Sequence, residues 1–183
     1  MKNNILSKLT YKRILIFSGI LTIIIFFALR YFGNPLITNN APGGIISFEL
    51  AKYNNQSIAI ISSWDLNAKV NAGLSLGIDF LFLVVYAIFF ATACYLVAQK
   101  YINKNNLMYK TGLFIAKLQF VAALFDAIEN IVLIKLLLGS NNNIFSLIAY
   151  YFASIKFVII AIAIIYIIIG YTAFLFQKGL ESE

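Results

Sequence analysis

The segment LFDAIENIVLIK, residues 124–135, places Asp126, Glu129 and Asn130 inside a run that otherwise has the composition of a helix in lipid. Hydrophobic residues make up 62% of the chain and charged residues 11%. A soluble domain has about half apolar and about a quarter charged residues. The sequence therefore predicts an integral membrane protein, and its fold must bury these polar groups.

Four apolar segments are long enough to cross about 30 Å of hydrocarbon, which takes roughly 20 helical residues. They are residues 14–32, 76–98, 111–138 and 144–175. The predicted fold is an all-α membrane protein, a single polytopic domain over residues 1–183, with four transmembrane helices in an antiparallel bundle.

The first segment also has the basic flank and short apolar core of a signal peptide. A cleavage site would need small residues after this core, but Arg30, Tyr31 and Phe32 stand there. These residues are more typical of an interfacial anchor, so we expect the segment to remain as a span.

The distribution of basic residues predicts the orientation of a chain that crosses four times. One side then receives Lys2, Lys8, Lys12, Arg13, Lys100, Lys104, Lys110 and Lys178. The other receives Arg30, Lys52 and Lys69. Because cytoplasmic loops are enriched in Lys and Arg, both termini are predicted to be cytoplasmic. Abundant Lys, Asn and Ile are typical of an AT-rich bacterial genome, so we expect a bacterial inner membrane.

The predicted extracytoplasmic loop, residues 33–72, opens with Asn, Pro and the pair Gly43 and Gly44, a turn composition. Helix is expected to restart near Ile45. A second short apolar run, IAIISSW, leads to Trp64, which we interpret as an aromatic anchor at the membrane surface. Two short interfacial helices are predicted, and they either cap the bundle or form a lid. Ser63 or Asp65 is the expected cap of the next helix.

Helical geometry, with about 100° of rotation per residue, places the polar groups of the third segment on one face. Gln119, Asp126 and Asn130 fall within about 60° of one another, with Glu129 at the edge of the same stripe. Lys117 and Lys135 lie on the opposite face and can extend to the headgroups.

The fourth segment offers a partner for these carboxyl groups. Ala149, Lys156, Ala163 and Gly170 are spaced seven residues apart and share one face. A stripe of small residues marks a close helix contact in a membrane, so Lys156 is expected to point into the bundle. We predict an ion pair between Lys156 and either Glu129 or Asp126.

The second segment adds Asp79 and Tyr86, which share a stripe with Ser75. Together with the groups above, they are expected to line one outward-facing polar cavity. The alternative is structural: charged residues in a membrane also pair simply to lock helices together. For Asp79 and Glu49, a solvated anchor or a pair with Lys52 or Lys69 is the competing interpretation.

The rest of the composition excludes several chemistries. The chain has one cysteine, Cys94, and no histidine, so it has no internal disulfide and lacks the commonest metal ligand and general base. We predict no metal site and no cofactor. The net charge of +7 includes no long Lys/Arg run. It therefore predicts anchoring at anionic lipids, with no nucleic acid as a partner.

Three motifs, APGGIISFELAK, LGIDFLFLVVY and FDAIENIVL, carry a resemblance over roughly residues 41–138. The sequence resembles a group of small, uncharacterised bacterial integral membrane proteins with four predicted spans. The resemblance implies that Gly43, Gly44, Glu49, Asp79, Asp126, Glu129 and Asn130 occupy recurring motif positions. It implies a fold and carries no activity.

Three classes of function remain open. The first is a protein whose outward polar pocket binds a small amphipathic or cationic ligand, with Asp126, Glu129 and Asp79 as counter-charges. The second is an intramembrane acid/base enzyme that moves a proton on a lipid-like substrate. The third is an accessory or assembly subunit that docks onto a membrane protein partner or a second copy. One lysine cannot balance two deep carboxylates, and this surplus favours the first class.

Overall fold

A computed structural model describes residues 2–180, and the side chains of residues 9–177. The side chains of Lys2, Lys8 and Lys178, which contribute to the predicted orientation, lie outside the described residues. The described part of the chain contains six α-helices and one short 3-10 helix. They are α1 (Lys2–Gly33), η1 (Asn34–Leu36), α2 (Ile45–Glu49), α3 (Asn54–Ser63), α4 (Leu66–Gln99), α5 (Asn106–Leu137) and α6 (Asn143–Leu180).

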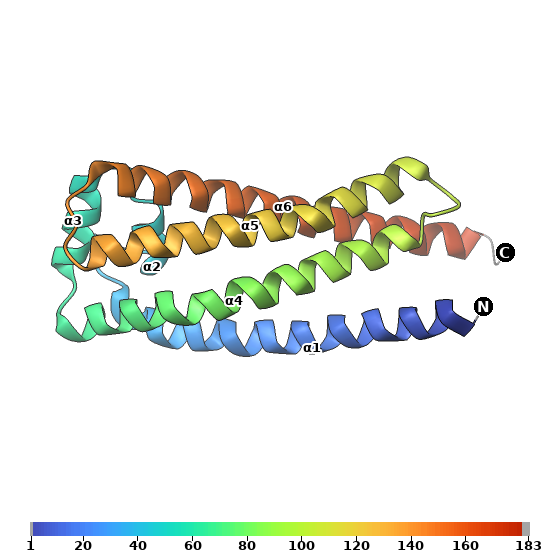
Figure 1. The fold of residues 1–183 in the computed structure, drawn as a ribbon, viewed down its shortest axis with the longest axis horizontal. Coiled ribbons are helices and arrows are strands. Elements are labelled where there is room, and N and C mark those ends of the chain that lie inside the picture. The colour runs from blue at the N-terminus through green and yellow to red at the C-terminus, as the bar shows by residue number, and fades with distance from the viewer. Residues whose placement is uncertain (1, 181–183) are drawn as a thin grey trace.

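The prediction of an all-helical protein is confirmed over these residues. Four long helices lie along the length of the molecule, and the short helices α2 and α3 gather at one end (Figure 1). The beginning of α1 and the end of α6 lie at the opposite end. Within the described residues, three helical stretches are long and apolar enough to cross a membrane: Leu9–Leu36, Leu66–Gln99 and Asn143–Gln177. The chain is therefore a membrane protein.

The remaining predicted span, residues 111–138, falls on α5. This helix is also 32 residues long, but it carries Lys117, Asp126, Glu129 and Lys135 and is not one of the three. It lies between α4 and α6 and packs extensively against both. The charged stretch that makes α5 unusual in composition thus lies on a helix that packs against two other long helices.

The small residues of α6 make the close contact that their spacing predicts. Ala149, Ala153 and Ala163 are fully buried. At Gly170 a Cβ atom would come within 2.6 Å of the Val97 side chain, so only glycine allows this approach to α4. Lys156 lies on the same buried face and is 4% exposed.

The loop between α1 and α4 differs from the predicted one in two respects. Trp64 is only 2% exposed, its Nε1 donates to the Leu36 carbonyl at 2.9 Å, and its ring packs edge-on against Phe48. The prediction that Trp64 is an interfacial anchor is therefore wrong, because the chain folds back and brings the Leu36 carbonyl to the indole. Asp65, one of the two expected caps, does cap α4 by accepting from the Ala68 amide at 2.7 Å, so this helix begins before residue 72, the predicted end of the loop.

Gly44 makes the reversal from which α2 begins. Its φ is +60°, a conformation that side-chain-bearing residues rarely adopt. Gly43 precedes it and donates its amide to the Ser47 hydroxyl at 2.9 Å. The turn at these two glycines directs α2 back toward the bundle.

Gly112→Ala is expected to lower the free energy of unfolding by about 1–3 kcal/mol, the usual cost of overpacking. The added Cβ would overlap the Tyr166 hydroxyl of α6 and lie 2.8 Å from Ala98 of α4. Gly77→Ala is the matched control, because no atom lies within 4 Å of its added Cβ and alanine favours helix. Thermal unfolding in detergent micelles measures both. If Gly112→Ala unfolds at or above the temperature of Gly77→Ala, the packing of α5 described here is wrong.

Candidate functional site

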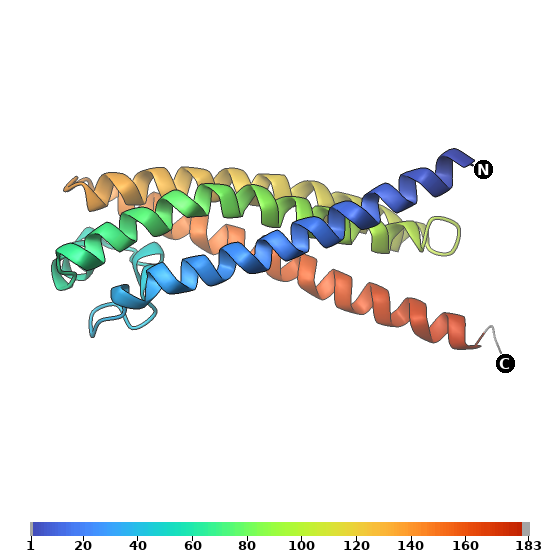
Figure 2. The same cartoon turned by 90° about the horizontal axis from the view of Figure 1, so that it is seen from below.

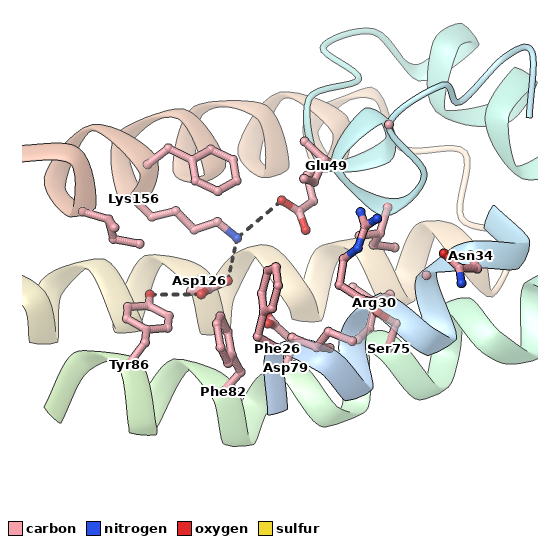
Figure 3. A pocket seen from close by; sticks show the side chains of 18 of the residues that line it. Phe26, Arg30, Asn34, Glu49, Ser75, Asp79, Phe82, Tyr86, Asp126 and Lys156 are labelled. Carbon is pink, nitrogen blue, oxygen red and sulfur yellow. Dashed lines mark hydrogen bonds and ion pairs between the residues drawn. The ribbon is translucent and has the colours of Figure 1, made fainter. Parts of the chain in front are cut away.

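The ammonium group of Lys156 lies at the centre of a buried cluster of carboxylates. Its Nζ is 2.7 Å from Asp126 Oδ1, 2.8 Å from Glu129 Oε2 and 3.6 Å from Glu49 Oε2. The ion pair predicted with Glu129 or Asp126 therefore forms with both. Figure 3 shows Lys156 of α6 extending toward Asp126 of α5 and Glu49 of α2.

Glu49 is the member of the cluster that the sequence did not assign to it. It is 8% exposed, so the interpretation as a solvated anchor is wrong. A pair with Lys52 was the other expectation, but α2 ends at Glu49 and Lys52 lies beyond the helix. The Lys52 ammonium instead lies over the rings of Tyr150 and Tyr151, at 5.5 and 5.8 Å.

Two hydrogen bonds extend the cluster to α4. The Tyr86 hydroxyl donates to Asp126 Oδ2 at 3.0 Å, and Asn130 Nδ2 donates to Asp79 Oδ2 at 2.7 Å. Asp79 is thus hydrogen-bonded to a residue of α5. A solvated anchor and a pair with Lys69 were the interpretations that the sequence had left open for it. The polar network joins α2, α4, α5 and α6.

Gln119 lies apart from this network. It is fully buried, and its Nε2 donates to the Ile115 carbonyl of its own helix at 3.2 Å. It does not line the cavity described below. Helical spacing placed Gln119 on the correct face, but it lies about two turns from Asp126 along the axis.

Acidic groups outnumber basic groups in the cluster. Four of the seven acidic residues of the sequence converge here. Lys156 is the only buried lysine or arginine among the described side chains. Burial raises the pKa of Glu49 above its ordinary value, and the attraction of Lys156 opposes this shift.

A cavity of about 280 Å³ adjoins the cluster. Its polar lining consists of Arg30, Asn34, Glu49, Ser75, Asp79, Tyr86, Asp126 and Lys156. Its apolar lining comes from α1, α2, α4 and α6 and includes the rings of Phe26, Phe82 and Phe157. Glu129 and Asn130 were also expected in the lining but are not part of it. They contact the lining residues Lys156 and Asp79. Trp64 does not line the cavity either, so α2 covers it without α3.

The contribution of α1 was missed from the sequence. Phe26, Leu29, Arg30 and Gly33 line the cavity, and Arg30 is exposed at its rim. Their spacing of three and four residues is that of one helix face, which is the signal that could have identified them. Arg30 was interpreted only as an interfacial anchor.

Neither the family models, nor the curated proteins, nor the solved structures compared with this chain include a match. The chemistry of the cavity follows from its own residues.

Lys156→Met is expected to cost about 3–5 kcal/mol of stability, because removal of one partner leaves buried carboxylates without a counter-charge. The triple variant Lys156→Met/Asp126→Asn/Glu129→Gln also removes the two carboxyl groups nearest to the lysine, and it should recover most of this loss. Thermal unfolding in micelles compares the two. A triple variant no more stable than the single one would show that the charges do not hold the cluster together.

The pKa of Glu49 predicts a pH dependence. A raised pKa in the folded protein means that the contribution of this group is present below its ordinary value of 4.5 and is lost as pH rises through the raised pKa. The unfolding temperature of Glu49→Gln relative to wild type should therefore increase as pH rises above 4.5. Ser47→Ala, a nearby change without a carboxyl group, should show a constant difference. A Glu49→Gln difference that is flat or decreases with pH would contradict the burial of this carboxyl group.

Proposed function

We propose that this chain is a four-span protein of a bacterial inner membrane that binds a small amphipathic ligand, with a cationic head, in its outward-facing cavity. The carboxylate surplus beside the cavity is the observation that carries the proposal.

The spacing of Lys117 and Lys135 supports α5 as the fourth span. Both side chains are exposed, whereas Asp126 and Glu129 between them are buried. The two lysines are 18 residues apart, or about 27 Å along a helix, close to the thickness of the hydrocarbon layer. Each lysine can therefore reach one headgroup region while the carboxylates stay inside the bundle.

The placement of the basic residues supports the orientation. Four crossings in an antiparallel bundle return the chain to its starting side, in agreement with the positions of the two ends in Figure 1. Lys12, Arg13, Lys100, Lys104 and Lys110 belong to the helix ends and the turn at that side. Because cytoplasmic loops are enriched in Lys and Arg, this side is expected to be cytoplasmic. The cavity, α2 and α3 would then lie on the outer side of the membrane.

The charge of the cavity supports a cationic head. The Lys156 ammonium already contacts three carboxyl groups. With Arg30 at the rim and Glu129 behind the wall included, four acidic groups face two basic ones. An ammonium group of a ligand would reduce this imbalance. The rings of Phe26 and Phe82 in the lining also suit a cation, which is attracted to aromatic rings. The ring of Phe157 already has the Lys156 ammonium 5.1 Å from its centroid.

The size and shape of the cavity support an amphipathic molecule. About 280 Å³ is at the lower end of the range for small-molecule sites, enough for a head and a short part of a chain. Its apolar lining comes from both α1 and α6 and includes Phe26, Leu29 and Ile160. An apolar tail would lie against these side chains.

Three probes with the same tail test the proposal: dodecylammonium, dodecanol and dodecanoate, titrated in turn into the purified protein by calorimetry in micelles. Wild type should bind the cation at least about tenfold more tightly than the other two. Asp79→Asn should lose roughly ten- to a hundredfold, because a hydrogen bond to a charged group contributes about 1.5–3 kcal/mol. Asp79 is the suitable target because it lines the cavity and is bonded to Asn130 instead of Lys156.

Asp65→Asn is the matched control, since it removes one carboxylate outside the cavity and asparagine also caps helices well. It should bind the cation as wild type does. Equal affinity for dodecanoate and dodecylammonium, or cation binding that Asp79→Asn leaves unchanged, would overturn the proposed function.

A further inference from the structure

A second and larger cavity, of about 970 Å³, lies at the end of the molecule opposite α2 and α3. It is a groove lined by the first half of α1, the last turns of α4 and the last turns of α6. These are the three helices whose length and composition fit a membrane span. The groove lies at one end of these helices, and it shares no lining residue with the outer cavity.

The walls of the groove are each fixed to α4. On one side, the rings of Tyr11 and Tyr95 are in contact, with centroids 4.6 Å apart and planes tilted by 44°, and they hold α1 against α4. On the other, the Tyr101 hydroxyl donates to the Gly170 carbonyl at 2.6 Å and holds α6 against α4. Figure 2 shows that α1 and α6 diverge toward this end. The groove is thus preformed, with two anchored walls and an open side.

The lining of the groove is amphipathic in the manner of a lipid site. Its body is apolar and includes Leu15, Val97 and Ile167. Lys12 and Lys100 bring positive charge to it from two different helices. The Lys100 ammonium lies 4.0 Å from the centroid of Phe174 and 5.0 Å from that of Tyr171, so it is positioned along the wall.

We propose that this groove binds a phospholipid with an anionic headgroup, whose phosphate lies between Lys12 and Lys100 and whose acyl chains lie along the apolar walls. Charge complementarity selects this occupant: basic residues near a membrane surface attract anionic lipids, each contributing about 1 kcal/mol. The groove has a volume of about 970 Å³, and its apolar walls match acyl chains. This site does not depend on the function proposed for the outer cavity.

The proposal is tested by native mass spectrometry of delipidated full-length protein, incubated with equimolar dioleoylphosphatidylglycerol and dioleoylphosphatidylcholine. The two lipids have the same chains and differ in head charge. Wild type should retain one phosphatidylglycerol at concentrations where phosphatidylcholine is not retained. Lys12→Gln/Lys100→Gln should weaken phosphatidylglycerol binding by about 25-fold, roughly fivefold for each lysine. Its binding of phosphatidylcholine should be unchanged.

Lys110→Gln/Lys117→Gln is the matched control, since it removes the same charge from exposed positions on α5 outside the groove. It should stay within about twofold of wild type, because phosphate contacts in the groove are intact. Leu15→Trp fills the groove without changing its charge, should also displace the lipid, and serves if the double lysine variant does not fold. Equal loss in both double variants, equal retention of the two lipids by wild type, or a dimer that covers the groove would each overturn the proposal.

Discussion

The contact of the Lys156 ammonium with Asp126 and Glu129 is the interaction on which the arrangement of this bundle depends. A buried ion pair is favourable only when its donors and acceptors are nearly all satisfied, because removing charges from water costs several kcal/mol per ion. Here α5 supplies two carboxylates and α2 supplies a third. The register of α5 against α6 and the position of α2 over both are therefore set by one side chain, with the alanine face of α6 allowing the close approach.

The same contact also leaves more carboxyl groups than basic groups in the cluster. A purely structural ion pair would match its groups one to one and close the space around them. In this protein Asp79 and Asp126 take their further partners from the neutral groups Asn130 and Tyr86, and a cavity remains beside them. Preorganised carboxyl groups next to aromatic rings are a chemical basis for recognising a cationic amphiphile.

The sequence was sufficient for the parts of the site that lie on the long helices α5 and α6. Asp126, Glu129 and Lys156 could be paired because helical periodicity fixes their faces and depth follows from counting residues. The roles of Glu49, Trp64 and Arg30 could not be predicted in this way. These roles depend on the path of residues 33–65. Gly44 reverses the chain there, and the Trp64 indole donates to the Leu36 carbonyl. As a result, α2 brings Glu49 close to Lys156. Contacts of this kind arise from tertiary folding and leave no periodic signal.

The carboxylates beside the cavity are proposed to hold a small amphipathic cation. Native mass spectrometry with lipid and metabolite identification on gently purified protein tests this claim most directly, with Asp126→Asn and Glu129→Gln variants that fold as well as wild type. Wild type should carry one specific amphipathic cation, and at least one of the two variants should lose it. If all three proteins carry the same bulk lipids and a partner protein co-purifies instead, the carboxylates serve assembly and the claim is contradicted.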